Sequence, residues 1–248
     1  MAGVVAIAFL GGLVAGSFVT AVAHRVPRGI SIAGPRSQCP ACGAPIAAYD
    51  NVPLLSWVLL RGRARCCGAP ISPRYPLTEL VVGMLFAATV LVYRHDPAEA
   101  VIGLVFVTML AAVTLTDLEQ RIIPNKILLV ASVICIAIAV PTDPGGLPER
   151  AIAAAAAGGL LFAAALAYPA GMGLGDVKLA AAMGLFIGRA VAPAILIALL
   201  AGSIVGLALI ARHGAKARKM AIPFGPFLAL GGVVGLLAGE QLIDLYLG

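Results

Sequence analysis

The sequence predicts an all-α polytopic membrane protein with about eight transmembrane helices and a small cytoplasmic domain between the first and the second. Composition is the first observation, because 61% of the 248 residues are hydrophobic and only 11% are charged. Soluble domains are about 45–50% apolar and about a quarter charged, so one water-soluble core cannot bury this much apolar surface. The second observation is that the apolar residues form long runs, interrupted by a single sizeable polar stretch at residues 24–75.

Each apolar run is expected to form one helix across the membrane. A crossing takes about 17–25 residues, and most of the runs reach that length, although the sixth is short and the fourth is marginal. The expected spans are 3–23, 76–93, 98–116, 126–141, 151–168, 177–189, 191–211 and 224–247.

The basic residues are the third observation, and they give the orientation. With the N-terminus outside, the inner loops hold all 17 Lys and Arg residues except Arg94, Arg150 and Arg189. Membrane proteins concentrate positive charge on the cytoplasmic side, so we expect both termini outside and the polar stretch in the cytoplasm. The net charge of +6 therefore reflects topology, and membrane lipid rather than nucleic acid is the expected partner.

The chain is divided on this basis into three regions. Residues 1–23 are the first transmembrane helix, residues 24–75 are a cytoplasmic cysteine-containing domain, and residues 76–248 are a seven-helix membrane domain. The length and the Pro and Gly content of the middle region favour a small irregular domain over a helix.

Four of the five cysteines lie in that polar region, as Cys39 and Cys42, then Cys66 and Cys67. Two close pairs of cysteines resemble a four-thiolate zinc site, which can hold together a domain too small to fold on apolar burial alone. The second pair is irregular, because the side chains of adjacent residues diverge and make poor joint ligands. A domain held by packing, with free or redox-active thiols, is the other interpretation that the residues leave open.

Among the eleven acidic residues, two aspartates lie where an apolar run meets the inner face. Asp117 lies in VTLTDLEQRIIPN and Asp176 in GMGLGDVKLA, and charged groups at such depths are candidates for function. Gly171, Gly173 and Gly175 would let the backbone turn sharply or approach another segment closely. Irregular backbone in a membrane is tolerated where protein or a water-filled cavity covers it, so this stretch is expected to form the wall of a polar cavity.

The remaining acidic residues carry less weight. Glu99 and Glu149 fall in short outer loops and are expected to lie in water. Glu240, near the outer end of the last run, is expected at the membrane interface.

Two aspartates held close together predict a specific chemistry. Like charges at short range cannot both ionise, so the pair shares one proton. One carboxylate then acts as a base on water and the other as an acid on the carbonyl or the leaving amine, and peptide hydrolysis by such a pair needs no cofactor. A proton- or cation-coupled carrier would use the same residues, and so would a structural pair that caps helices or binds Arg121 and Lys178.

An ordered series of motifs, running nearly end to end, resembles the type IV prepilin peptidases, the leader peptidases of pilus and type II secretion systems. A lone G-x-G-D would be a weak signal, whereas seven motifs in order are a strong one. They are GSFVTAVAHRVP, CPAC, YDNVPLLSWVLLRGR, ISPRYPLTEL, TDLEQRIIPN, GMGLGDVKLAAAMG and IPFGPFLALGG.

The resemblance implies an aspartyl endopeptidase of the G-x-G-D class in the bacterial inner membrane. Its substrates would be prepilins and pseudopilins, whose short basic leader is removed after a glycine at the cytoplasmic face. The resemblance places the catalytic pair at Asp117 and Asp176, with Gly173, Gly175 and Lys178 as supporting motif residues.

Many members of that family also methylate the new N-terminus with S-adenosylmethionine, through a domain that carries two C-x-x-C pairs. The first pair corresponds to Cys39 and Cys42, whereas in the second pair the first cysteine falls on Ala64 and the second on Cys67. Cys66 occupies a position that is not normally a ligand. The resemblance thus implies S-adenosylmethionine as cofactor and a zinc site with Cys66 as a substitute ligand, or else a peptidase without methyl transfer.

Overall fold

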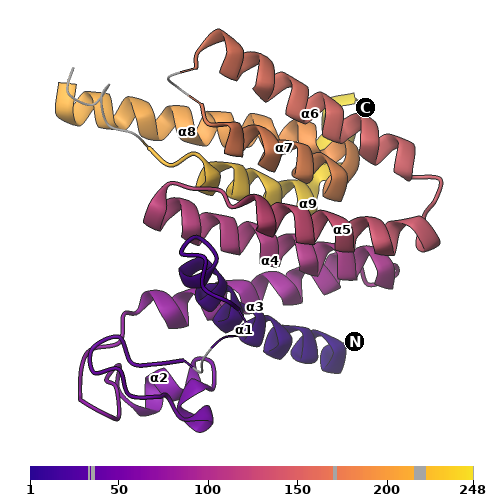
Figure 1. Ribbon diagram of the computed structural model, residues 1–248. Coiled ribbons are helices and arrows are strands. Elements are labelled where there is room, and N and C mark those ends of the chain that lie inside the picture. The colour runs from indigo at the N-terminus through magenta and orange to yellow at the C-terminus, as the bar shows by residue number, and fades with distance from the viewer. Residues whose placement is uncertain (33, 35–36, 170–171, 215–221, 248) are drawn as a thin grey trace. The chain divides into compact units, whose positions relative to one another are not determined.

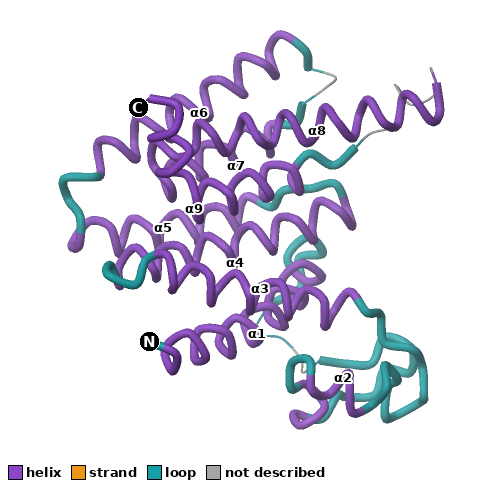
Figure 2. Tube along the Cα trace, turned by 180° about the vertical axis from the view of Figure 1, so that it is seen from behind, coloured by secondary structure: helices purple, strands orange, loops and turns teal. Residues whose placement is uncertain are grey.

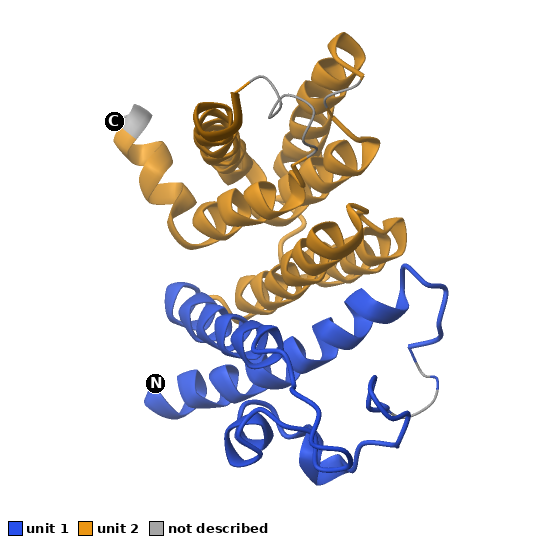
Figure 3. Ribbon diagram, turned by 90° about the vertical axis from the view of Figure 1, so that its left-hand side faces the viewer, with its two compact units in different colours: residues 1–94 blue, residues 95–248 orange. Residues whose placement is uncertain are grey.

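The computed structural model describes residues 1–32, 34, 37–169, 172–214 and 222–247, and the side chains only as far as residue 245. The predicted motif glycine Gly171 lies outside this range. Within it the chain is helical, without strands, so the predicted all-α class is confirmed. The chain forms two compact units, residues 1–94 and 95–248 (Figure 3). The predicted division at residues 23 and 75 stays a prediction.

The first unit is built on two long helices that pack closely, α1 (Ala2–Arg25) and α3 (Arg74–Val92). Glycines allow the contact, because a Cβ at Gly12 would lie 2.7 Å from the Cα of Gly83, and a Cβ at Gly16 2.6 Å from the Cα of Glu79. Small residues at such crossings let two backbones approach in lipid. Between these helices the polar region forms the 3₁₀ helix η1 (Ala48–Asn51) and the short helix α2 (Leu55–Leu59).

The second unit holds the remaining long helices (Figure 1). Helix α4 packs on α5 and α9, α6 packs on α7, and α8 packs on α9; the same neighbours appear in the reverse view (Figure 2). Phe106 of α4 stacks on Phe186 of α7 with ring centroids 5.0 Å apart in the core. The helices are α4 (Pro97–Gln120), α5 (Asn125–Thr142), α6 (Leu147–Ala167), α7 (Leu174–Ile187), η2 (Gly188–Ala190), α8 (Val191–His213) and α9 (Gly225–Leu247).

Seven stretches among the described residues are long and apolar enough to cross a membrane. One of them, Leu174–His213, has 40 residues, about twice the length of one crossing. Gly188, with φ of 52° and ψ of −136°, ends α7 within it, and the chain turns back into α8 (Figure 1). Within the described residues, the eight predicted runs therefore correspond to eight helices, α1 and α3 to α9.

Helix α7 is short, as the sequence indicated. Its 14 residues rise about 21 Å at 1.5 Å per residue, less than the roughly 30 Å of a bilayer core. Both of its ends must therefore find polar partners at membrane depth. The outward faces of its neighbours are apolar, with Leu129, Ile152, Leu166 and Ile204 each more than 60% exposed, as expected where lipid is the solvent.

Candidate active site

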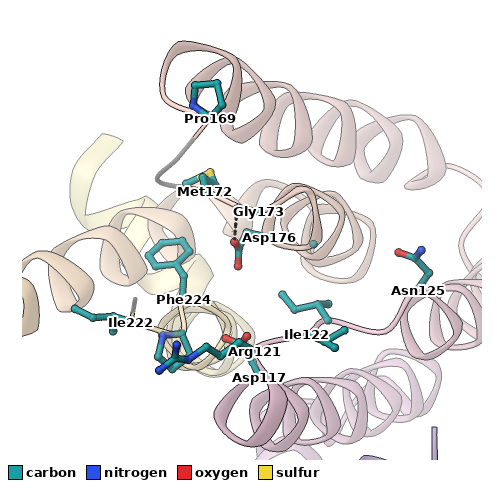
Figure 4. A pocket seen from close by; sticks show the side chains of 13 residues that line it. Asp117, Arg121, Ile122, Asn125, Pro169, Met172, Gly173, Asp176, Ile222 and Phe224 are labelled. Carbon is teal, nitrogen blue, oxygen red and sulfur yellow. Dashed lines mark hydrogen bonds between the residues drawn. The ribbon is translucent and has the colours of Figure 1, made fainter. Parts of the chain in front are cut away.

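Asp117 and Asp176 line one pocket of about 530 Å³ in the second unit (Figure 4). Asp117 lies in the last turn of α4 and Asp176 in the first turn of α7. In Figure 4 their carboxyl groups enter the pocket from opposite sides. The rest of the lining comes from the α4–α5 connection with the first residue of α5, from the segment before α7 with the first turn of that helix, and from the segment before α9: Arg121, Ile122, Ile123, Asn125, Pro169, Met172, Gly173, Gly175, Ile222, Pro223 and Phe224.

The Asp117 side chain is held by the start of another helix. The residue is buried, at 6% exposure, and its Oδ2 accepts a hydrogen bond of 2.8 Å from the backbone N–H of Gly225, the first residue of α9. Helix α4 continues to Gln120 and ends where Arg121 adopts the left-handed conformation with φ of 55°. Glu119, the next acidic residue of the helix, is exposed, so Asp117 is the last acidic residue of α4 that is buried.

Asp176 is fixed by its own helix. It is the third residue of α7, and its Oδ2 accepts a hydrogen bond of 3.2 Å from the backbone N–H of Gly173, the N-cap residue. A carboxylate here satisfies a free N–H at a helix start and interacts favourably with the helix dipole. Gly175 meets the α4–α5 connection, where an added Cβ would lie 3.1 Å from the Cβ of Ile123. The glycines of this motif thus provide both the cap and the close approach.

The structure brings four of the five predicted residues of this site to the pocket wall, namely Asp117, Asp176, Gly173 and Gly175. Lys178 does not line it. Its Nζ instead donates a hydrogen bond of 3.1 Å to Oδ1 of Asn125, which does. This hydrogen bond ties α7 to the first residue of α5 beside the pocket.

Sequence reasoning missed two contributions to the pocket. Phe224, which lines the pocket, and Gly225, whose N–H binds Asp117, belong to the IPFGPF motif, for which the sequence suggests no role. Asn125 is the last residue of the TDLEQRIIPN motif, and the sequence alone gives it no place in the site. A helix start placed after a Pro-Phe-Gly turn is a sequence signal for free N–H groups, but nothing in the sequence shows which side chain receives them.

The two carboxyl groups can act together on one substrate. In each of them Oδ2 accepts an amide hydrogen bond, and this contact favours the Oδ1 atoms as the carriers of a proton shared by the pair. This arrangement suits a water molecule or a peptide carbonyl placed between one base and one acid.

In the first unit the four cysteines of the polar region form one cluster. All four Sγ atoms lie within 4.8 Å of one another, with 3.7 Å between Cys39 and Cys67, 3.3 Å between Cys42 and Cys66, and 3.8 Å between Cys66 and Cys67. Zinc–sulfur bonds of about 2.3 Å in a tetrahedron place sulfurs about 3.8 Å apart, so the cluster fits a thiophilic divalent ion. The expectation that the adjacent side chains diverge too far is wrong, because both reach the cluster.

The cluster is built from two turns of the same form. In the first, the N–H of Gly43 bonds the carbonyl of Cys39 over 2.8 Å, and in the second the N–H of Gly68 bonds that of Ala64 over 2.7 Å. The two glycines have φ of 73° and 72°, which glycine adopts without steric cost. Ala64 therefore occupies in the second turn the position that Cys39 occupies in the first. Cys66 supplies the fourth thiol from a position that holds no cysteine in the first turn.

The thiols of the cluster differ in acidity. Hydrogen bonds from the backbone of Ala41 and Cys42 lower the pKa of Cys39 to about 7. Hydrogen bonding with neighbouring thiols, first that of Cys42, raises the pKa of Cys66 to about 12. A metal ion binds thiolates, so it must displace the Cys66 proton to gain its fourth ligand.

Comparison with known proteins decides the family. Residues 10–93 match the bacterial peptidase A24 N-terminal domain, and residues 104–211 match the type IV leader peptidase family. The chain is 34% identical over 281 residues to the prepilin leader peptidase/N-methyltransferase of Aeromonas hydrophila, which covers 96% of this chain and 92% of the relative. The chain belongs to the type IV leader peptidase family. The resemblance recognised in the motifs is confirmed.

Other members of the family are equally similar. The prepilin leader peptidase/N-methyltransferase of Bacillus subtilis is 34% identical over 243 residues, or 97% of each chain. That of Burkholderia pseudomallei is 34% identical over 268 residues, 94% of this chain and 85% of the relative. No solved structure matches. With its apolar helices, this member of the family is a multi-pass membrane protein.

Proposed function

We propose that this chain is a membrane aspartyl endopeptidase that removes the basic leader of prepilins and pseudopilins after a glycine, at the cytoplasmic face of the bacterial inner membrane. The observation that carries the proposal is the meeting of Asp117 and Asp176, from helices α4 and α7, at one pocket. The names of the relatives and the match to the leader peptidase family supply the substrate class.

The reaction needs only the two carboxyl groups and water. The ionised aspartate takes a proton from the water, whose oxygen attacks the scissile carbonyl carbon while the protonated aspartate gives its proton to the carbonyl oxygen. The diol then collapses: one of its hydroxyl groups returns a proton to the ionised aspartate, the C–N bond breaks, and the leaving nitrogen takes a proton from the carboxyl group that had received one from water. A new carboxylate and a new amine result, and the pair returns to its starting state of one shared proton.

The charge pattern supports the orientation. Asp117 and Asp176 lie at the ends of apolar helices that the basic residues assign to the inner side. Both termini then lie outside, and the cysteine domain and the aspartate pair face the cytoplasm, where the leader of a membrane-anchored prepilin would remain.

The second activity is methylation of the new N-terminus. The relatives are named for it, and the region between α1 and α3 carries the DNVPLLSW motif together with the cysteine cluster. S-adenosylmethionine, when bound, would supply the methyl group for the new amine and would leave as S-adenosylhomocysteine, with a proton released from the nitrogen. Peptide cleavage must come first, because it produces that amine.

The cysteine cluster would hold zinc through Cys39, Cys42, Cys66 and Cys67. The sulfur spacing and the all-thiolate donor set favour that ion, and a four-coordinate site is closed to substrate. Zinc would therefore hold the two turns together and take no part in either reaction. The alternatives of a peptidase without methyl transfer and of a cation-coupled carrier have no observation that favours them.

The test is cleavage of a prepilin by aspartate variants. Asp117→Asn and Asp176→Asn keep the size of the side chain but remove its acid–base function, so each is expected to abolish cleavage while the protein still inserts. Asp244→Asn is the matched control, since Asp244 is an exposed aspartate in α9 and does not line the pocket. Cleavage by either pocket variant at the unmodified rate would reject the catalytic pair.

A further inference from the structure

Gly225 makes the one described hydrogen bond that reaches the Asp117 carboxyl group from outside α4. Its N–H donates to Oδ2 over 2.8 Å, and the bond is buried. The two residues lie 108 positions apart, so the end of α4 and the start of α9 meet at this point. Phe224, the residue before it, lines the pocket.

Space, rather than backbone conformation, demands glycine at this position. A Cβ at residue 225 would lie 2.8 Å from Oδ2 of Asp117 and 3.2 Å from both its Cβ and its Cγ. Gly225 is not among the residues with positive φ, so another residue could adopt its backbone. Any side chain at this position would therefore displace the Asp117 side chain, without straining the backbone of the turn.

A shift of helix α4 cannot relieve the contact between Asp117 and an added Cβ at residue 225. Its neighbour Thr116 and the preceding Val113 are fully buried, and a packed interior resists displacement. The strain of an added Cβ would instead rotate the Asp117 carboxyl group away from the N–H. The hydrogen bond and the direction of Oδ1 would be lost together.

The start of α9 is equally fixed. Gly232 brings α9 onto α4, since a Cβ there would lie 3.0 Å from Leu110 and 3.2 Å from Phe106. On the other side Phe224 lies against Gly202 of α8, where a Cβ would come within 3.2 Å of its ring. Two packed helices thus hold the Gly225 N–H in place.

The two carboxyl groups are held differently. Both receive an N–H from a helix start, where free donors and the positive end of the dipole favour a carboxylate. The bond to Asp176 comes from its own helix and is exposed, at 3.2 Å. The bond to Asp117 comes from a separate helix and is shorter and buried.

We propose that Gly225 is a positioning residue of the peptidase. Its N–H fixes Oδ2 of Asp117, and the absence of a side chain leaves space for the orientation of the carboxyl group in which Oδ1 faces the substrate. The inference rests on the proposed function and extends it, because the site then needs a third segment besides the two that carry the aspartates. Gly225 touches no reacting atom and acts only through Asp117.

The test compares Gly225→Ala with Gly206→Ala in steady-state cleavage of a purified prepilin in detergent or nanodiscs. Gly206 lies in α8, and a Cβ there meets no atom within 4 Å, so this control is expected to match the unmodified enzyme. Gly225→Ala is expected to lower kcat by about 10- to 100-fold, the rate equivalent of one hydrogen bond to a charged group. KM is expected to stay within about twofold, because the substrate-binding walls are unchanged.

A second variant removes the donor without adding an atom. Cell-free synthesis with glycolic acid at position 225 replaces the amide N–H by an ester oxygen, and a similar loss of kcat is expected in protein that melts cooperatively, at a somewhat lower temperature because a buried hydrogen bond is lost. This variant keeps the test sharp if Gly225→Ala does not fold. Unmodified kcat in either folded variant, or a loss confined to KM, would overturn the inference.

Failure of the proposed function has a different signature. If Asp117→Asn still cleaves the prepilin, the catalytic pair is wrong whatever Gly225 does. If Asp117→Asn is inactive and both Gly225 variants are fully active, only the role of Gly225 is rejected.

Discussion

Arg150 on α6 forms an ion pair with Glu99 on α4, and its guanidinium also donates hydrogen bonds to the carbonyls of Leu185 and Phe186 at the end of α7. Arg150 is only 8% exposed. The last carbonyls of a helix have no partner within it, and Arg150 supplies one for the short α7. Because α4 carries Asp117 and α7 carries Asp176, this contact joins the two aspartate-bearing helices at the ends away from the pocket.

Loss of this cation is expected to destabilise the protein strongly. Arg150→Met leaves the Glu99 carboxylate and two carbonyls without the guanidinium. Breaking a buried ion pair costs about 3–5 kcal/mol, and we expect the lower end because the Glu99 side chain is 22% exposed. The check is the melting temperature of the purified protein in detergent.

A second ion pair, exposed rather than buried, provides the control for the Arg150 variant. Arg189 and Glu240 also form an ion pair, but both side chains are 57% exposed, and exposed pairs contribute little. Arg189→Met is therefore expected to melt close to the unmodified protein. The double variant Glu99→Gln/Arg150→Met should recover part of the loss, since no charge is left buried; equal melting of the Arg150 and Arg189 variants would contradict this account.

The cysteine cluster makes a prediction about metal content. Cys66→Ala and Cys67→Ala are each expected to lower bound zinc well below one ion per chain, because each removes one of four sulfurs. Cys135→Ala is the control, as that cysteine is buried in α5. Elemental analysis of the purified protein measures the result, and a full zinc content in the Cys66 variant would remove this residue from the ligand set.

The correspondence between Ala64 in the second cysteine turn and Cys39 in the first can be tested directly. Ala64 occupies the place that Cys39 has in the first turn. The double variant Ala64→Cys/Cys66→Ala is therefore expected to bind zinc again, with the ligand returned to the matched position. If it stays metal-free while the unmodified protein binds zinc, the two turns are not equivalent.

The hydrogen bond of Glu79 leads to a prediction about the cysteine-containing region between α1 and α3. Its Oε2 accepts a hydrogen bond of 2.8 Å from the N–H of Leu54, a residue with φ of 59°, and such a conformation costs about 1–3 kcal/mol unless its surroundings hold it. Glu79→Ala should release this segment, raise its amide exchange and reduce methylation of mature pilin while cleavage continues. Glu79→Gln keeps an acceptor and should largely preserve both; equal exchange at Leu54 in the two variants would contradict the role of Glu79.

The sequence was a good guide to the helices and to the paired aspartates. Long apolar runs identify membrane helices because lipid leaves the backbone few alternatives, and aspartates at the inner ends of such runs are rare enough to single out Asp117 and Asp176. It was a poorer guide to pairing across helices. Glu99 was expected in water and pairs with Arg150, and the exposed Glu149 accepts a bond from the N–H of Arg189.

The same limit applies to the donors of the site. The G-x-G-D motif carries its own cap within four residues, so Gly173 could be read from the sequence. The Gly225 N–H reaches Asp117 across 108 positions, and only the packing of α4 against α9 determines that contact. The residues next to Asp117 or Gly225 in the sequence therefore do not reveal this contact.

The central claim is that Asp117 and Asp176 form one catalytic pair for leader removal. Its most direct test is intact mass spectrometry of a prepilin co-expressed with this chain, beside the Asp176→Asn and Asp244→Asn variants. The account predicts loss of the leader mass with the unmodified enzyme and with Asp244→Asn, a further gain of one methyl group where methylation follows, and an intact prepilin with Asp176→Asn. Leader removal by a well-inserted Asp176→Asn variant would contradict it.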